Sequence, residues 1–406
     1  MVLSAILVVL LLFLLVTRYY DDALYRKAAV LSLSGHVITT LVLIPRLSYS
    51  WDIGAFHTTA IEIAAGTVPG SSTSVTSFAT VQALVYTLFT PQPQTIGLFN
   101  GLFAVLTVIP AMYIASSLYP RVEQDTPAVM LLVLFMPVQF LILSIPMRDA
   151  LSVILFFTLL ATLTRVIRTG NLQRGLRAIP LWAMLFLLRV ELAMITVLGV
   201  LMVLCIGFLR VLDAELSVPS LLVLFGGVGS LGVGLFSELL YSFDRVNSAL
   251  QSRSTGGAVY LDGMSYGSWF DFLIASPARG FYFQFAPFPL HVGSMFHLLA
   301  LLGTVPIIVL AVSAVRSLSE CKTDTAVAML LVVVYITGIV GYGTINSNFG
   351  TNVRHRIAFD YLLIVFASPV LHQWWLRLRV WVGVVPSEDG EDYKQQQEAQ
   401  ELHRGA

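Results

Sequence analysis

The stretch YSWDIGAFHTTAIEIAAG, Tyr49–Gly66, is the one around which we expect the chain to be organised, because it sets an acid, Asp52, at the mouth of a hydrophobic segment. If the residues from Ile53 onward are helical, Asp52, Phe56 and Ala60 lie at four-residue spacing on one stripe, with the carboxylate at the helix start. The adjoining sequence offers no obvious positive partner. Asp52 is therefore either an ordinary helix N-cap or a functional acid.

The composition of the whole chain is that of a polytopic membrane protein. Of its 406 residues, 57% are apolar and only 11% are charged, with a mean hydropathy of +0.84. Such a chain cannot cover a soluble surface with charge. The formal net charge is zero, which gives no indication of a nucleic-acid partner. The two cysteines, Cys205 and Cys321, are too few for a disulfide framework or a metal cluster.

The apolar runs predict an all-α, polytopic integral membrane protein with roughly eleven transmembrane or partly inserted helices, at about 20 residues a crossing. A short run at 74–90 is expected to dip into the membrane or lie at its interface, and a long run at 179–209 to form a hairpin of two short helices. We expect one transmembrane domain over 1–386 and a disordered polar tail over 387–406. The remaining runs lie near 2–17, 28–45, 96–118, 127–146, 149–166, 218–240, 289–315, 325–344 and 357–376.

The basic residues orient these helices, because short loops rich in arginine and lysine stay in the cytoplasm. Arg165, Arg168, Arg174 and Arg177 mark their loop as cytoplasmic. Alternating from this loop, we expect a multi-pass protein of the cell membrane with a cytoplasmic C-terminus. The extracytoplasmic set then holds the external loops 46–95 and 241–288, together with 148–149 and 345–356.

Arg148 and Asp149 form a charged pair between two apolar runs, in SIPMRDALSVILFF, where Pro146 favours a break and Asp149 can cap the next helix. A charge at such depth costs about 2.5–3.5 kcal/mol on insertion scales, so the pair is either functional or a snorkelling interface pair. The planar fork of an arginine suits a phosphate group. We therefore predict that this pair contributes to substrate binding.

Arg189 and Glu191 interrupt the apolar run FLLRVELAMI two residues apart, a spacing at which helical side chains do not face each other. They indicate either a polar cavity or the turn of the predicted hairpin. His57, within the opening stretch, is either a packing residue or a base or ligand.

A further basic cluster precedes the last crossing, in NSNFGTNVRHR at Asn346–Arg356. On the extracytoplasmic side such a cluster runs against the usual charge bias, which indicates either an anionic ligand such as a lipid phosphate or pairing with headgroups. We predict that Asn348, Arg354 and Arg356 bind substrate.

The loop 241–288 mixes acids and arginines with Tyr260, Tyr266, Trp269 and Phe270, a mixture that fits either a carbohydrate surface or interfacial anchoring. The chain has no Walker loop, no HExxH and no GxSxG elbow. The run GGVGSLGVG at 226–234 is better explained by helix packing. Nucleotide-driven chemistry and zinc hydrolysis are therefore not supported.

Several stretches together resemble multi-pass glycosyltransferases of the GT-C class and related polysaccharide-assembly membrane proteins. They are WDIGAFHTTAIEIAAG with the following VQALVYTLFTPQPQTIGLFNGLFAVLTVIPAMYIASSLY, then RDAL, APFPLH and NFGTNVRHR. The resemblance implies a GT-C-like fold, an inverting transfer and a catalytic base at Asp52. The commoner pattern has a second acid where this chain has Ile53. Without that acid the sequence does not support a divalent metal, which stays an open alternative.

We therefore predict a glycosyltransferase that moves a sugar from a polyprenyl-phosphate donor to a glycan, lipid or protein acceptor on the extracytoplasmic face. The alternatives are a polymerase or ligase that joins lipid-linked glycans, and a flippase or transporter. The predicted catalytic base is Asp52, and the predicted substrate-binding residues are His57, Arg148, Asp149, Arg189, Glu191, Asn348, Arg354 and Arg356.

Overall fold

The computed structural model describes residues 2–20, 22–46, 51–120, 122, 127–211, 227, 243–253, 259–261, 263–291 and 295–383. These residues are almost entirely helical and contain no strand; their one isolated β-bridge joins Val259 to Asn348. The all-α prediction is confirmed. The apolar run at 218–240 and the polar tail at 387–406 lie outside the described residues, apart from position 227.

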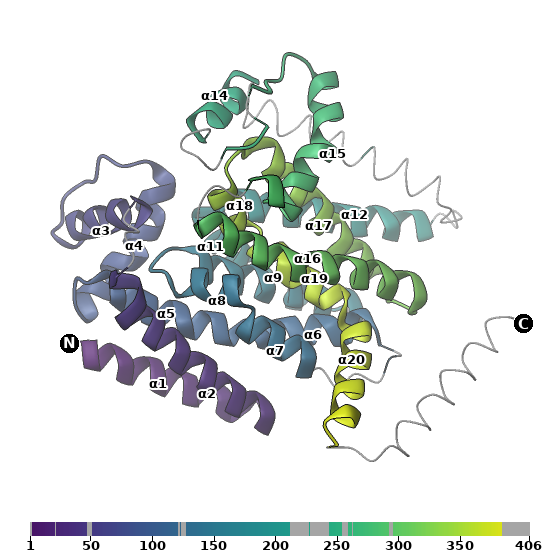
Figure 1. The fold of residues 1–406 in the computed structure, drawn as a ribbon, viewed down its shortest axis with the longest axis horizontal. Coiled ribbons are helices and arrows are strands. Elements are labelled where there is room, and N and C mark those ends of the chain that lie inside the picture. Colours follow the sequence, from purple (N-terminus) through teal and green to yellow (C-terminus); the bar gives the residue numbers. More distant parts are fainter. Residues whose placement is uncertain are drawn as a thin grey trace, which may run out of the picture.

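From α1 to α12 and from α15 to α20, helices follow one another with connections of a few residues (Figure 1). Figure 1 shows α3 and α4 as a pair beside the bundle, and α14 and α15 projecting from it. The first half comprises α1 (Val2–Tyr19), α2 (Ala23–Ile38), the π-helix η1 (Thr39–Leu43), the 3-10 turn η2 (Ile44–Arg46), α3 (Trp51–Ala64), α4 (Thr73–Leu88), α5 (Pro93–Leu106), α6 (Val108–Leu118), α7 (Pro127–Phe135), α8 (Pro137–Ser144), α9 (Asp149–Thr169), α10 (Leu172–Gly175), α11 (Ala178–Leu188) and α12 (Val190–Val211). The second half comprises α14 (Phe243–Arg253), α15 (Trp269–Phe285), η3 (Pro289–His291), α16 (Met295–Glu320), α17 (Thr325–Ile345), α18 (Phe349–His355), α19 (Ile357–Phe366) and α20 (Ser368–Trp381).

Among the described residues, six helical segments are long and apolar enough to cross a membrane, and eight if each of two bent helix pairs counts as one crossing. The chain is therefore a multi-pass membrane protein. The residues that the structure describes supply six to eight candidate crossings, and not the roughly eleven transmembrane or partly inserted helices predicted for the whole chain. The helices at Val2–Arg18 and Val75–Leu88 are apolar but shorter. The six segments are Ala23–Arg46, Pro93–Leu118, Asp149–Thr169, Val190–Leu209, Ala300–Glu320 and Thr325–Ile345.

The two irregular regions of the sequence are only partly as predicted. The run at 74–90 forms α4, which packs against α3. The run at 179–209 breaks at Arg189, as a hairpin requires. The two helices are unequal, because α11 has 11 residues, whereas α12 has 22 and is long enough to cross a membrane by itself. The break lies at Arg189, which the sequence offered as the turn of the hairpin, but the unequal lengths of the two helices were not predicted.

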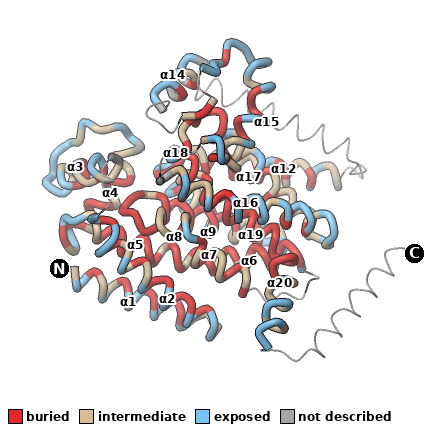
Figure 2. The backbone as a smooth tube through the Cα atoms, in the orientation of Figure 1, coloured by how far each residue is buried: buried red, intermediate tan, exposed pale blue. Residues whose placement is uncertain are grey.

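The centre of the bundle is α19, in which all ten residues are buried. A helix that is hydrophobic all round belongs inside a protein rather than at its surface. It packs against α16, α6, α7, α9 and α17. Figure 2 shows the same pattern, with buried residues concentrated along the middle of the bundle and exposed ones on α20 and on the outlying helices.

A fully buried ion pair lies within this core. Arg356 Nε is 3.6 Å from Asp360 Oδ2, and both side chains have no exposed surface. The amides of Gln139 and Gln284 donate to the two Asp360 oxygens, at 2.7 and 2.8 Å. Arg356 also donates to the Gln284 and Ala286 carbonyls, at 3.1 and 2.7 Å. The pair thus ties α8, α15 and α19 together.

Breaking this buried pair is expected to destabilise the protein strongly, because Asp360→Asn leaves the Arg356 charge buried without its carboxylate. Loss of one partner of a buried pair typically costs about 3–5 kcal/mol. The matched control is Glu320→Gln, which removes the acid of the exposed i,i+4 pair with Arg316, where the side chains are 58% and 48% exposed for Arg and Glu. That change should cost less than about 1 kcal/mol. Thermal unfolding in detergent measures both, and equal losses would contradict the structural role of Asp360.

The close contact between α15 and α17 depends on a missing side chain. A Cβ at Gly343 would lie 2.6 Å from the Arg279 carbonyl oxygen and 2.8 Å from the Gly280 nitrogen, both of which are backbone atoms. Two residues earlier in the same helix, a Cβ at Gly341 would meet nothing within 4 Å. The two helices can therefore approach only because position 343 is glycine.

We accordingly expect Gly343→Ala to destabilise the fold by about 1–3 kcal/mol through overpacking. Gly341→Ala should be neutral or stabilising by up to about 1 kcal/mol, because alanine favours a helix. Melting temperatures of the two purified variants give the comparison. A Gly343→Ala protein as stable as the Gly341→Ala protein would show that the helices can separate at no cost.

Candidate functional site

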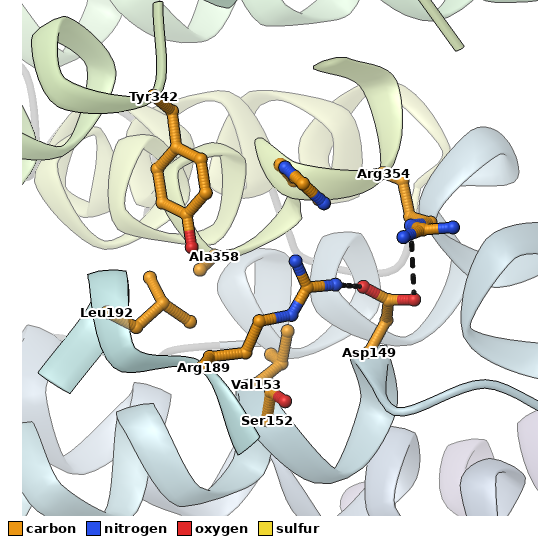
Figure 3. Close-up of a pocket in the computed structure, with 9 residues that line it drawn as sticks. Asp149, Ser152, Val153, Arg189, Leu192, Tyr342, Arg354 and Ala358 are labelled. Carbon is orange, nitrogen blue, oxygen red and sulfur yellow. Dashed lines mark hydrogen bonds and ion pairs between the residues drawn. The ribbon is translucent and has the colours of Figure 1, made fainter. Parts of the chain in front are cut away.

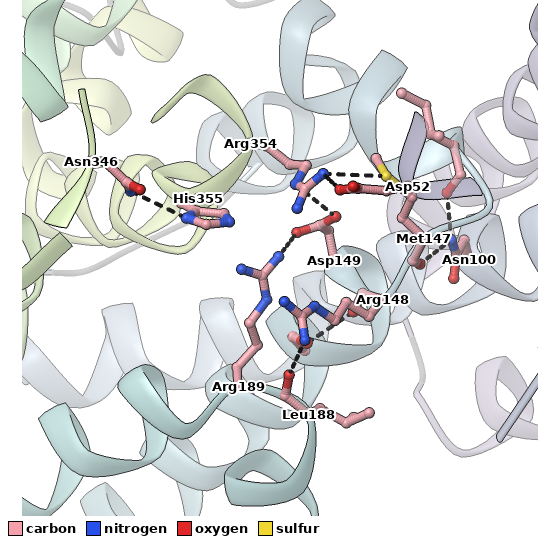
Figure 4. A network of polar contacts seen from close by, with 12 residues as sticks. Asp52, Asn100, Met147, Arg148, Asp149, Leu188, Arg189, Asn346, Arg354 and His355 are labelled. Atoms are coloured by element: carbon pink, nitrogen blue, oxygen red, sulfur yellow. Dashed lines mark hydrogen bonds and ion pairs between the residues drawn. The ribbon is translucent and has the colours of Figure 1, made fainter. Parts of the chain in front are cut away.

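A chain of ion pairs connects four residues that are far apart in sequence (Figure 4). Arg354 of α18 is paired with Asp52 of α3, and its Nε lies 3.5 Å from Oδ2 of Asp149 at the start of α9. Asp149 Oδ1 in turn accepts from Arg189, at the break between α11 and α12. The sequence predicted each of these residues as part of a site, and the structure brings all four together.

The two acids enter this chain from the first turns of helices, where a negative charge is favourable to the helix dipole. Asp52 lies in the first turn of α3 and Asp149 is the first residue of α9. Neither acts as the N-cap: α3 begins at Trp51, and the N-cap position of α9 is occupied by Arg148. The prediction that Asp149 caps the following helix was therefore wrong by one residue.

The turn that presents Arg148 and Asp149 is held by an asparagine that the sequence did not single out. The Asn100 amide, from α5, donates to the carbonyls of Ile145 and Met147, at 2.6 and 2.8 Å. Asn100 is 1% exposed. A buried amide that satisfies two carbonyls at a break of helical hydrogen bonding fixes the position of that break. The break at Pro146 is the one predicted.

Arg148 lies beside the ion-pair chain (Figure 4). Its Nη1 donates to the Leu188 carbonyl at 3.0 Å, and its guanidinium lies 5.9 Å from the centre of the Phe56 ring. Burial, followed by the neighbouring positive charge of Arg189, lowers the pKa of Arg148 to about 10. It therefore stays protonated at neutral pH. Three guanidinium groups thus gather around two carboxylates.

Arg354 is positioned by the short helix α18, and Asn348 forms the start of that helix. The Asn348 side chain is the N-cap and accepts from the backbone nitrogens of Gly350 and Thr351, at 2.9 and 3.4 Å. A capping side chain of this kind contributes about 1 kcal/mol to helix stability. Asn348 thus orients Arg354, and its predicted contact with substrate stays a prediction.

A small cavity lies along this chain (Figure 3), lined by residues from α9, α12, α17, α18 and α19. Its volume is only about 10 Å³, at the lower limit for a single water molecule. The ion pairs themselves fill the space, so a larger ligand must separate them. The lining consists of Asp149, Ser152, Val153, Arg189, Leu192, Tyr342, Arg354, His355 and Ala358.

Sequence reasoning did not select Tyr342 or His355 from that lining. Tyr342 lies in an apolar helix, where nothing in the sequence distinguishes it from a packing residue. His355 stands between two arginines that were selected, and it hydrogen-bonds to the Asn346 amide at 3.3 Å. Its ring lies 5.2 Å from that of Tyr342. The position of His355 in the NVRHR cluster was the only available signal.

Three predicted residues have other surroundings. The His57 Nδ1 is 2.8 Å from the Tyr86 hydroxyl, which joins α3 to α4, and burial lowers the pKa of His57. Arg356 belongs to the buried Asp360 network, so its donors are directed toward the core. Glu191 is half-buried in the first turn of α12, and its charge acts on Arg148.

Within the part of the chain that the structure describes, no three His, Cys, Asp or Glu side chains gather closely enough to hold a metal ion. The arrangement is instead one of arginines with carboxylates, which can exchange a carboxylate for another anion. Arginine binds carboxylate and phosphate with the same bidentate geometry. A phosphate would therefore compete with Asp52 and Asp149 for the same guanidinium groups.

Comparison with family models, curated proteins and solved structures finds no match for this chain. Its function must therefore be inferred from the geometry and chemistry of the site.

The two acids of the site should differ in their effect on stability. Asp149→Asn removes a carboxylate that is 5% exposed and that serves both Arg189 and Arg354, so a loss of about 3–5 kcal/mol is expected. Asp52→Asn removes a carboxylate that is 41% exposed, and should cost less than about 1 kcal/mol. Thermal unfolding of both variants in one detergent tests this order, and the reverse order would exclude Asp149 as the centre of the network.

Proposed function

We propose that this protein is a membrane glycosyltransferase of the GT-C class that transfers a sugar from a polyprenyl-phosphate donor to a glycan, lipid or protein acceptor. The observation that carries the proposal is the Asp52–Arg354–Asp149–Arg189 chain, in which a half-exposed acid adjoins buried arginines. An acid that can take a proton thus stands next to groups that can hold a phosphate. The charge bias of the loops places the reaction on the extracytoplasmic face.

The proposed reaction is a single displacement with inversion. Asp52 takes the proton of an acceptor hydroxyl as its oxygen bonds to the anomeric carbon of the donor sugar. The bond between that carbon and the phosphate oxygen breaks, and its electron pair leaves with the lipid phosphate. Arg354 and Arg189, in a site of low dielectric, stabilise the negative charge that develops there. A donor delivered through the membrane on its lipid carrier needs no nucleotide-binding site.

The ion pairs suggest an order of binding. With Arg354 paired to Asp52, the carboxylate is already engaged and the cavity is nearly filled. The phosphate that links the lipid to the sugar is a diester with one negative charge, and its two free oxygens can accept both arms of a guanidinium. It would therefore compete with Asp52 for Arg354. The donor thus binds first, and its arrival frees the base for the acceptor.

A polymerase or ligase for lipid-linked glycans would use the same groups and differs only in its product. A transporter or flippase is favoured by a different observation, the two bent helix pairs, with angles of 52° at α7–α8 and 69° at α19–α20. Broken helices are frequent where transporters bind their substrates. A transporter does not require a base, so the effect of Asp52 on chemistry separates the two classes.

Asp52→Asn is expected to lower sugar transfer by about 10²–10⁴-fold, because the amide cannot accept the acceptor proton. Transfer is measured in membranes, from a panel of radiolabelled polyprenyl-phosphate sugars to the endogenous acceptor. The matched control, Glu62→Gln, changes the other acid of α3 to its amide and should leave the rate unchanged. Full activity of a folded Asp52→Asn protein would exclude Asp52 as the base. Glycolipid movement across the bilayer without transfer would favour the transporter.

A further inference from the structure

A second cavity, about 200 Å³ in volume, lies next to the ion-pair chain. Its walls come from η1 and η2 at the end of the Ala23–Arg46 crossing, from α3, from the start of α5 and from the turn before α9. This groove is lined by Thr40, Ile44, Pro45, Ile53, Pro93, Gln94 and Pro146.

Most of the side chains that line the groove are apolar, and none is charged. Five of its seven residues are isoleucine or proline. One of the two polar side chains is already engaged, because the Thr40 hydroxyl donates to the Ser144 carbonyl at 3.1 Å. A cavity of about 150 Å³ with aliphatic walls is large enough to bind an apolar molecule of the size of benzene. The groove is therefore large enough for part of a hydrocarbon chain, which its isoleucine and proline side chains can contact.

One end of the groove adjoins the charged site. Ile53 follows Asp52 directly, and Pro146 precedes Met147, whose sulfur accepts from Arg354 Nη1 at 3.5 Å. Ile44, Ile145, Met147 and Ile53 also pack together as one apolar cluster. A molecule with an apolar chain in the groove thus has its polar end beside Arg354.

The surroundings of the groove indicate lipid rather than a peptide or a second copy of the chain. Ile44 and Pro45 end a segment long and apolar enough to cross the membrane. Val42 and Leu43, just before them, are 45% and 42% exposed. Apolar side chains exposed on a membrane-crossing segment face acyl chains. A hydrocarbon chain can therefore pass from the bilayer into the groove without crossing water.

We propose that this groove binds the hydrocarbon chain of a lipid phosphate, next to the phosphate, while Arg354 and Arg189 hold the phosphate itself. The inference rests on the proposed function and deepens it, because it gives the donor's chain a defined place. It also assigns recognition of the carrier to η1, η2 and α3, which the sequence did not predict. The apolar cavity is open while the charged one is filled, so the chain enters before the phosphate separates the ion pairs.

The test uses the full-length protein in lipid nanodiscs and a polyprenyl phosphate with a photoreactive diazirine in the isoprene unit nearest the phosphate. After illumination, the labelled peptides are identified by mass spectrometry. We expect label on peptides that contain Ile44, Ile53 or Pro93, and loss of label when excess unlabelled polyprenyl phosphate is present. The corresponding polyprenol, which lacks the phosphate, should protect much less because it has nothing for Arg354 to hold.

A pair of substitutions on one helix gives the matched comparison. Ile53→Trp fills the groove and should lower labelling about tenfold, because about two methylene groups of the bound hydrocarbon chain would no longer be buried. Ile61→Trp adds the same ring to α3 at a residue that is 43% exposed and not part of the groove, and should leave labelling unchanged. Equal melting temperatures of the two variants ensure that the loss reflects the groove and not the fold.

The outcomes separate this inference from the proposed function. Label confined to other helices, with labelling still lowered by Arg354→Gln, overturns the groove and leaves the transferase proposal standing. Equal protection by polyprenol and by polyprenyl phosphate also overturns the inference, because the chain would then bind without the charged site. Specific labelling of the groove, combined with full transfer by Asp52→Asn, supports the groove and overturns the catalytic role of Asp52.

Discussion

Burying arginine inside an apolar helical bundle is the constraint on which the rest of this structure depends. A guanidinium stays charged at any physiological pH, so it must find carboxylates and carbonyls or remain at the surface. Arg354 and Arg356 stand two residues apart at the junction of α18 and α19, and each meets this requirement in a different direction. Arg356 is paired with Asp360 in the core, whereas Arg354 reaches the acids of α3 and α9.

This division places a polar site against a rigid support. The Arg356 network fixes α18 and α19 against α8 and α15 through amide and carbonyl groups that are fully buried. The ion-pair chain on the other side joins α3, α9 and the break at Arg189. Groups that must change partners when a ligand binds work best when their supporting shell does not move. Two residues of separation thus give this protein one arginine in the core and one in the ion-pair chain.

The charged site and the groove beside it differ in how much space they leave open. Opposite charges at low dielectric close the space between them, so the polar cavity shrinks to about the size of a water molecule. The groove, whose lining has no charged pair, keeps a volume of about 200 Å³. Under the proposed function, a lipid phosphate would meet the groove first, and its phosphate would then separate the ion pairs.

The sequence alone determined the helical membrane class, because its apolar runs are of the length, about 20 residues, at which a helix crosses the bilayer with its backbone hydrogen-bonded. It also identified Asp52, Arg148, Asp149, Arg189 and Arg354, since charges in apolar runs are conspicuous. Only the tertiary structure decided how they pair, because Arg354 and Asp52 are 302 residues apart, and Arg189 and Asp149 are 40 apart. No local pattern tells Arg354 from Arg356, or marks Asn100 and Tyr342. The direction of a side chain and the length of a helix are decided by what packs against them, and hydropathy records neither.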